Sequence, residues 1–228
     1  AALFAFCLYQ GQACESGTRL LLPESLHDEF VARLVERAAA IRVGDPDDFD
    51  TDMGPIISAE QRQRIEHYVE LGTKEGATLA FGGARLTGGE FDSGNWFGPT
   101  IFTDVDNWMT IAQEEIFGPV LVVIKYRSVA EAVAIANDSE YGLSAGVWSE
   151  DIDAALDVAA QIESGTVWIN DWHMVNALYP FGGYKQSGNG RELGPHALDE
   201  YTEEKFVHVD LARRIENKVY DLVVPRED

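Results

Sequence analysis

The chain has 228 residues, of which 46% are hydrophobic and 25% are charged, a balance typical of a soluble globular protein with a buried core. Its 39 acidic and 17 basic side chains give a formal net charge of −22, which argues against nucleic acid as a partner because polyanions require a basic surface. No apolar run reaches the roughly 18 residues that a membrane span needs. Two cysteines are too few for a disulfide framework, so we expect a reducing, cytoplasmic compartment and no membrane association.

Helical periodicity recurs along the chain. After the proline at position 23, apolar residues at 30, 34, 38 and 41 share one face of a predicted helix. Two capping-box patterns, Ser58 with Gln61 and Ser128 with Glu131, predict the starts of two further helices. Apolar residues that recur between positions 152 and 162 predict a fourth amphipathic helix.

Short apolar runs alternate with these helices and predict strands. Because the runs are apolar on both faces, they favour an α/β fold with a largely parallel sheet covered by helices. From about Pro195 the pattern changes to an acidic stretch, a short strand at Phe206–Val209 and a tail. The other predicted strands are Leu20–Leu22, Thr78–Phe81, Val120–Ile124, Ala145–Trp148 and Thr166–Ile169.

The two cysteines lie in different surroundings. Cys7 stands inside an apolar run, where a free cysteine behaves as a small buried hydrophobe. Cys14 has small and polar neighbours, and Gly11 three residues earlier can bend the chain. A turn lets a thiol face a cleft, and nearby backbone N–H groups favour its thiolate, so Cys14 is the candidate nucleophile.

Several segments, in order along the chain, resemble the motifs of the aldehyde dehydrogenase superfamily. The segment around Cys14 resembles the nucleophile motif of that family, and the series extends over roughly residues 3–210. We identify the chain as the C-terminal, nucleophile-bearing portion of such an enzyme. The segments are GQACESGTR at 11–19, GDP at 44–46, DMGP at 52–55, EEIFGPV at 114–120, ND at 137–138, YGL at 141–143, GTVWIN at 165–170, PFGGYKQSG at 180–188, GRELG at 190–194 and YTEEK at 201–205.

This resemblance implies the oxidation of a small-molecule aldehyde to a carboxylic acid, with NAD or NADP as the cofactor. The Cys14 thiolate would add to the carbonyl carbon, loss of a hydride would leave a thioester, and water would hydrolyse that thioester. Such chemistry needs an oxyanion hole and a base that activates water. The backbone N–H of Cys14 is one oxyanion donor by resemblance.

The resemblance also assigns roles to four other side chains. Glu115 matches a glutamate that hydrogen-bonds the nicotinamide ribose, and Phe117 matches an aromatic residue that packs beside that ribose. Phe181 matches an aromatic residue of the substrate tunnel, and Glu192 matches a glutamate proposed to relay protons. We expect no metal site, because the five histidines are scattered without the spacing of metal ligands.

For the fold, the resemblance implies an open, twisted sheet with helices on both faces. Residues 1–195 would form a catalytic domain that lacks its N-terminal part, and residues 196–228 would form an oligomerisation strand and tail. The strand at Phe206–Val209 is expected to complete a sheet in a neighbouring subunit of a homodimer or homotetramer. Arg191 and Glu203 match a charged pair that links the active-site loop to this interface.

Other features of the family lie upstream of the nucleophile. The chain starts inside an apolar run without methionine, and residues 1–13 contain no acidic residue that could serve as the general base. Most of the dinucleotide-binding domain would also precede Cys14. We therefore expect the isolated chain to be inactive. A truncated structural subunit and a thiol esterase stay open as alternatives, and neither the aldehyde nor the choice between NAD and NADP is decided.

Two shorter patterns suggest other chemistry and fail on context. GLSAG at residues 142–146 fits the G-x-S-x-G elbow of serine hydrolases, which requires a strand, a turn and then a helix. Here a predicted helix precedes and a predicted strand follows. GNGREL at residues 188–193 is similar to a dinucleotide fingerprint, but Leu193 replaces its third glycine and no apolar strand precedes it.

Overall fold

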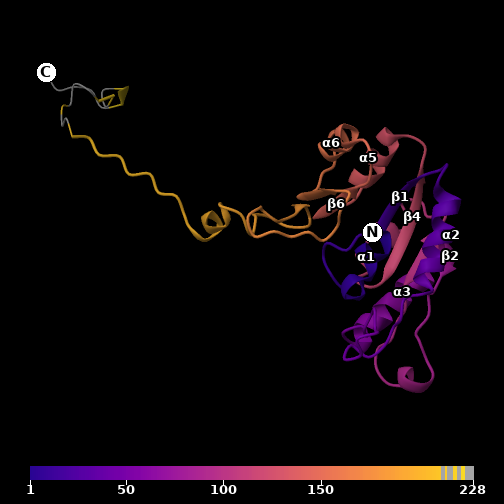
Figure 1. Ribbon diagram of the computed structural model, residues 1–228. Coiled ribbons are helices and arrows are strands. Elements are labelled where there is room, and N and C mark those ends of the chain that lie inside the picture. The colour runs from indigo at the N-terminus through magenta and orange to yellow at the C-terminus, as the bar shows by residue number, and fades with distance from the viewer. Residues whose placement is uncertain (212–213, 215–217, 220–221, 224–228) are drawn as a thin grey trace.

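The main sheet is built around one strand that is buried on both faces. In the computed structural model, which describes residues 1–211, 214, 218–219 and 222–223, four strands lie in the order β1-β4-β3-β2 (Figure 1). β4 pairs in parallel with β1 and β3, whereas β2 pairs antiparallel with β3. The predicted largely parallel α/β sheet is therefore confirmed. The bounds are β1 Arg19–Pro23, β2 Thr78–Phe81, β3 Thr100–Thr103 and β4 Val120–Tyr126.

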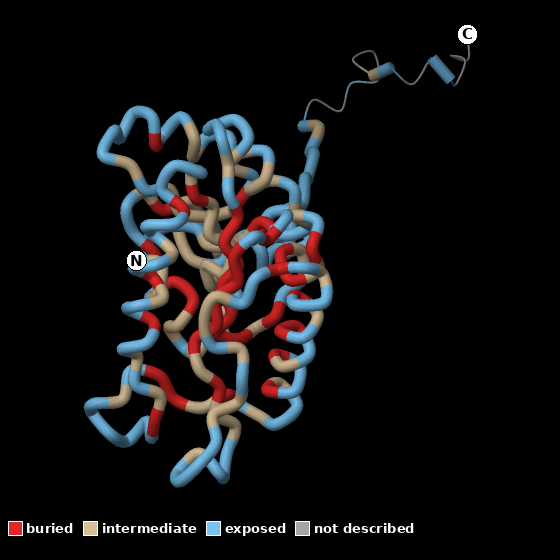
Figure 2. The backbone as a smooth tube through the Cα atoms, turned by 90° about the vertical axis from the view of Figure 1, so that its right-hand side faces the viewer, coloured by how far each residue is buried: buried red, intermediate tan, exposed pale blue. Residues whose placement is uncertain are grey.

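Alternate side chains of β4 point to opposite faces of the sheet and join two separate cores. Residues 120, 122 and 124 pack with α3 (Ala59–Glu75) and α4 (Thr110–Gln113), and residues 121 and 123 pack with α1 (Ala2–Cys7) and α2 (His27–Ala38). Figure 2 shows the buried segments gathered in the middle of the molecule between exposed outer elements. Helices thus cover both faces, as expected.

Both predicted serine caps form. Ser58 Oγ accepts a hydrogen bond from the Gln61 N–H at 3.1 Å and begins α3, and Ser128 Oγ accepts one from the Glu131 N–H at 3.2 Å and begins α5 (Val129–Asn137). The fourth predicted helix, α6 (Ile152–Ala159), is shorter than its apolar pattern and buries only Ala155. None of the helices formed by the described residues is both long and apolar enough to cross a membrane.

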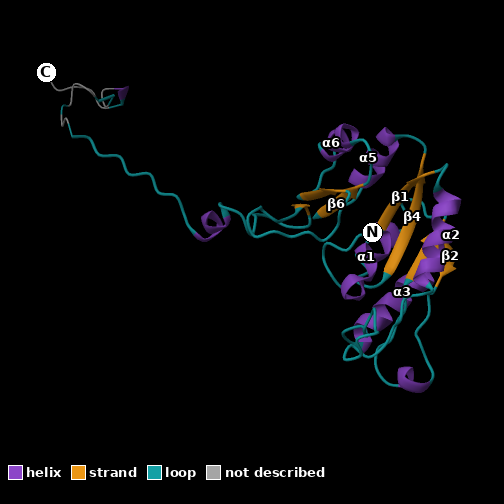
Figure 3. Cartoon of the chain, viewed as in Figure 1, coloured by secondary structure: helices purple, strands orange, loops and turns teal. Residues whose placement is uncertain are grey.

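The remaining elements are short (Figure 3). β6 (Ser144–Val147) pairs in parallel with β7 (Thr166–Ile169), and both strands were expected to within one residue. β3 and the antiparallel pair β5 (Tyr141–Gly142) and β8 (Tyr184–Lys185) are absent from the predicted strands. Three 3₁₀ turns complete the described elements: η1 Leu8–Gly11, η2 Gly89–Asp92 and η3 Ala197–Tyr201.

η3 already lies away from the body of the molecule, and the chain continues outward after it (Figure 1). Residues 202–210 have no regular secondary structure, and Phe206, Val207 and Val209 are 89%, 70% and 66% exposed. Within the described residues, the predicted strand at Phe206–Val209 therefore has no strand partner. Its expected partner belongs to another subunit, so the pairing stays a prediction.

The Ser58 cap gives a test of the fold. Replacing Ser58 with alanine leaves the Gln61 N–H without its acceptor, and such a loss costs about 1 kcal/mol. We expect Ser58→Ala to lower the free energy of unfolding by that amount in urea titrations. Ser25→Ala is the matched control, because Ser25 is exposed and its side chain makes no hydrogen bond in the described structure. Equal stabilities of the two variants would contradict the role of the cap.

Candidate functional site

Cys14 occupies the turn that leads from η1 into β1. The Ser16 N–H donates to the Ala13 carbonyl at 3.0 Å and closes the turn, and the Gly17 N–H donates to the Ala5 carbonyl at 2.9 Å and ties the turn to α1. The thiol of Cys14 is free and the residue is exposed, as a nucleophile must be. This placement agrees with the predicted turn.

The pKa of each thiol is raised above its ordinary value, but the physical causes differ. Burial raises the pKa of the Cys7 thiol to about 12, so Cys7 stays protonated and unreactive at neutral pH. Partial burial raises the pKa of Cys14 as well, and the hydrogen bond to Glu15 and the charge of Glu15 raise it further. The backbone N–H groups of Cys14 and Glu15 act in the opposite direction without reversing the shift.

Glu15 is the side chain in contact with the candidate nucleophile. The Cys14 Sγ donates to one carboxylate oxygen, Oε2, at 3.4 Å, and His173 Nδ1 lies 3.1 Å from the other, Oε1. Burial raises the pKa of the Glu15 carboxyl, but hydrogen bonds from its own backbone N–H, from His173 and from Cys14 outweigh burial and lower the pKa overall. Glu15 is therefore ionised at neutral pH.

The backbone of Glu15 is also held from a distant part of the chain. Its carbonyl oxygen accepts hydrogen bonds from Trp172 Nε1 at 3.2 Å and from Ser144 Oγ at 3.3 Å. Ser144 is the serine of the GLSAG pattern. It follows α5 and the two-residue strand β5, and it begins β6, so the expected strand after the serine is present where a hydrolase elbow requires a helix. Ser144 therefore supports the turn that carries Cys14 and does not form a hydrolase elbow.

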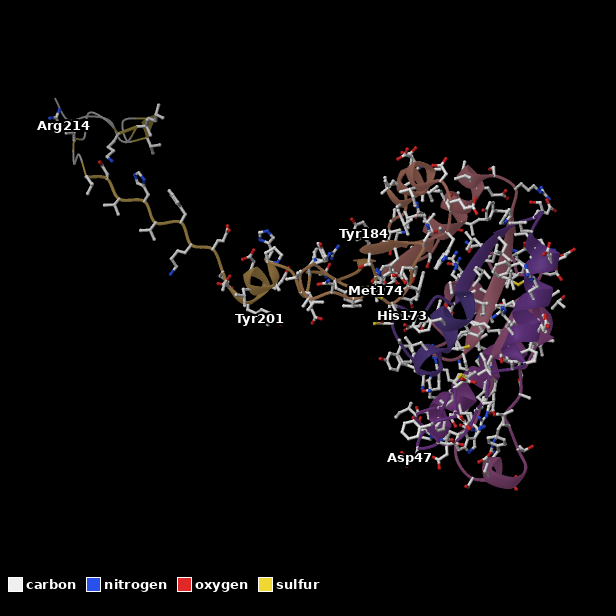
Figure 4. All side chains as sticks on the ribbon, viewed as in Figure 1. Asp47, His173, Met174, Tyr184, Tyr201 and Arg214 are labelled. Carbon is white, nitrogen blue, oxygen red and sulfur yellow. The ribbon has the colours of Figure 1, made fainter. Side chains whose placement is uncertain are left out.

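Aromatic rings form the wall behind this turn. Trp172 is 8% exposed and packs against Trp168, with ring centres 5.1 Å apart, and against Trp148 at 6.1 Å. His173 packs edge-on against Phe4, whose ring centre lies 5.5 Å away. Figure 4 shows His173 and Met174 at the junction between the body of the molecule and the segment that leaves it.

The turn around Cys14, called here the nucleophile turn, touches the segment at 114–120, called here the cofactor segment because of its expected role. The contact is made by two glycines, Gly11 and Gly118. Gly11 has a φ of +67°, and a Cβ at this position would lie 2.2 Å from the carbonyl oxygen of Gly118. Only glycine permits both the left-handed backbone and this close approach. The Gln12 side chain adds a tie by accepting a hydrogen bond from the Ile57 N–H at 3.0 Å.

Helix α3 fixes the backbone of the cofactor segment. Gln61 Nε2 donates to the carbonyls of Ile116 and Phe117 at 3.0 and 2.8 Å, and Arg64 Nη2 donates to the Glu115 carbonyl at 2.7 Å. Phe117 is half-buried with a φ of +60°, a conformation that these bonds stabilise. The Glu115 carboxylate is exposed, with no hydrogen bond or ion pair within the described part of the chain.

Phe181 and Glu192 face each other across an isolated β-bridge. The Phe181 N–H donates to the Glu192 carbonyl at 2.7 Å, and the Glu192 N–H donates to the Phe181 carbonyl at 2.8 Å. Phe181 is half-buried and Glu192 is exposed. The two candidates are thus brought together, but among the described residues no hydrogen bond or ion pair joins either of them to Cys14.

No ion pair between Arg191 and Glu203 forms among the described residues of this one chain, so their pairing at a subunit interface stays a prediction. Arg191 Nη1 donates to the carbonyls of Gly183 and Gly190 at 2.9 and 2.6 Å, and its guanidinium lies 5.3 Å from the centre of the Tyr184 ring. These contacts engage Nη1 of the guanidinium.

Two groups at the site were not assigned a role from the sequence. Glu15 is the immediate neighbour of Cys14, and that adjacency was a usable signal for a carboxylate near the thiol. His173 lies 158 positions from Glu15, and no spacing rule connects such distant residues. From the sequence, His173 is only one of five scattered histidines that are not expected to bind metal.

Comparisons with known proteins agree with this arrangement. The betaine aldehyde dehydrogenase of Bacillus subtilis is 49% identical over 207 residues, which are 91% of this chain and 42% of that protein, and the Brucella melitensis protein of the same name is 48% identical over 205 residues, 89% and 42%. The chain therefore spans well under half the length of these relatives.

Solved structures of aldehyde dehydrogenases resemble the chain in sequence about as closely as these relatives do. A crystal structure of betaine aldehyde dehydrogenase from Staphylococcus aureus in complex with NAD+ has a TM-score of 0.87 and 46% identity, and covers 88% of this chain and 40% of its own. An aldehyde dehydrogenase mutant from Bacillus cereus has a TM-score of 0.85 and 46% identity, with 89% and 40% covered. The model of the aldehyde dehydrogenase family matches residues 1–207, and the chain belongs to that family.

Proposed function

We propose that the protein carrying this chain oxidises a small-molecule aldehyde to a carboxylic acid, with Cys14 as the nucleophile and NAD+ or NADP+ as the cofactor. The contact between Gly11 and Gly118 carries this proposal, because it holds the turn that bears the exposed thiol beside the segment expected to hold the nicotinamide ribose. The relatives named for betaine aldehyde and the neighbour bound to NAD+ support the same activity.

The residues present fit one end of the cofactor. The Glu115 carboxylate is exposed, and a carboxylate can accept hydrogen bonds from ribose hydroxyls. The Phe117 ring stands on a backbone that Gln61 fixes, which suits a residue that packs beside a ribose. Bound NAD+ or NADP+ supplies the hydride acceptor of the oxidation.

The chain's own residues supply the covalent steps. The Cys14 thiolate attacks the aldehyde carbon, and the backbone N–H of Cys14 donates to the oxygen that becomes negative. Water later attacks the thioester carbonyl and releases the acid from Cys14. We assign Glu192 to proton transfer in that hydrolysis and Phe181 to the substrate wall.

Loss of the nucleophile tests the activity. In the protein that carries this chain, Cys14→Ser is expected to reduce formation of reduced cofactor from an aldehyde to the assay background, because a hydroxyl at this site lacks the nucleophilicity of a thiolate. Cys7→Ala is the control and should keep the rate, since Cys7 is half-buried and its pKa is about 12. Ester cleavage by the parent protein with no formation of reduced cofactor would instead support the thiol esterase.

The role of Glu115 has its own test. Glu115→Gln keeps the shape but removes the charge that strengthens a hydrogen bond to the ribose. We expect the single-turnover rate of hydride transfer to fall by about 10- to 100-fold through mispositioning, while adduct formation at Cys14 survives. Glu114→Gln is the matched control, because Glu114 engages Tyr68, whose hydroxyl donates to it at 2.6 Å. An unchanged hydride step in Glu115→Gln would refute the assignment.

We also propose that the protein is a homo-oligomer linked by residues 206–209. These residues are exposed and carry no strand partner in the described structure, and an unpaired strand recruits another chain. Light scattering of a version that ends at Tyr201 should give a smaller particle than the parent, whereas a version that ends at Asp210 should keep its size. The same particle size for all three proteins would show that this segment is not the link.

A further inference from the structure

A carboxylate lies beside the candidate nucleophile and has a partner on each oxygen. Glu15 Oε2 is 3.4 Å from Cys14 Sγ, and Oε1 is 3.1 Å from His173 Nδ1. The side chains of Glu15 and His173 are only 17% and 5% exposed. The negative charge is therefore held at a defined position next to the reacting sulfur and is largely shielded from bulk water.

The surrounding structure holds this pair in place. The carbonyl of Glu15 accepts hydrogen bonds from Trp172 and Ser144, which fix its backbone, and His173 holds its carboxylate. His173 has a left-handed backbone with a φ of +59° and packs edge-on against both Phe4 and Trp172. Its second ring nitrogen, Nε2, is buried without a hydrogen-bond partner in the described structure, so one polar position faces the interior of this wall.

We propose that Glu15, positioned by His173, is a specificity-determining residue that makes the site at Cys14 favour aldehydes with a positive charge and disfavour aldehydes with a carboxylate. This inference rests on the proposed function. An aldehyde carbon bonded to Sγ brings a charge on its nearest substituents within roughly 4–7 Å of the Glu15 carboxylate, where Coulomb energy changes binding several-fold even at high dielectric.

The net charge of the chain acts in the same direction. The net charge of −22 makes the surrounding field negative, although salt screens that long-range part. A charge held at the nucleophile is screened less because it is partly buried.

The experiment measures charge preference at Cys14 without cofactor or aldehyde. Two methanethiosulfonates of equal length, one ending in trimethylammonium and one in sulfonate, react with the same thiolate. In both reactions the Cys14 sulfur attacks the sulfenyl sulfur of the reagent, a disulfide forms and methanesulfinate leaves. Glu15 also raises the pKa of Cys14, but this effect cancels in the ratio of the two rates. A Cys7→Ala background leaves Cys14 as the single thiol.

Glu15→Gln is expected to lower the ratio of the cationic rate to the anionic rate by about fivefold or more at low salt. Glu24→Gln is the matched control: it removes the same charge from an exposed site beyond the far end of β1 and should leave the ratio unchanged. Glu15→Ala repeats the loss of charge without an amide, in case the glutamine disturbs His173.

His173→Asn tests the positioning role. Asparagine tolerates the left-handed backbone of His173 but is too short to reach Glu15, so the ratio should fall part of the way. An unchanged ratio in this variant, with a lowered one in Glu15→Gln, would overturn the role of His173. An unchanged ratio in both Glu15→Gln and Glu15→Ala would overturn the inference, whatever the dehydrogenase assays show. A lowered ratio in a protein that never reduces the cofactor would refute the proposed activity alone.

Discussion

The contact of Gly11 with the carbonyl of Gly118 is the constraint on which the site depends. It exists because the nucleophile turn leads into β1, the cofactor segment leads into β4, and these two strands are parallel neighbours. Segments that precede adjacent parallel strands emerge at the same edge of the sheet. The Val122 N–H donates to the Thr18 carbonyl at 2.9 Å and fixes the register there. The strand pairing thus brings residues about a hundred positions apart into contact.

Helix α3 gives the site its second support. Its first two turns present Gln61 and Arg64 to the backbone of the cofactor segment, and the Ser58 cap determines where that helix starts. The next residue of α3, Ile65, is fully buried and packs directly against Gly118. A Cβ added at Gly118 would lie only 2.4 Å from the Ile65 side chain. The same helix therefore packs the core and orients the groups expected to receive the ribose, which leaves little freedom for changes on its inner face.

Much of this arrangement could be predicted from the sequence, and the failures have physical causes. β4 was evident because its apolar run reflects burial on both faces. β3 was missed because Thr100 and Thr103 look polar at its ends, although all four residues are buried and Thr100 Oγ1 is satisfied by the Gly98 carbonyl. The turn predicted at Cys14 is present, but the link between Glu15 and His173 depends on how distant segments pack, which one sequence does not encode locally.

The double burial of β4 also determines how the molecule can open. Five consecutive residues, 120–124, are buried and contribute alternately to two cores, and β4 is paired with β1 on one side and β3 on the other, so freeing its amides means separating strands that both cores hold together. Opening that exposes the amides of β4 to hydrogen exchange must then be global, whereas α5, which buries no residue, can open locally. The turn of Cys14 and the cofactor segment are attached to β1 and β4, the pair with the most cooperative protection. The proposed chemistry is thereby placed next to the part of the fold that should exchange last.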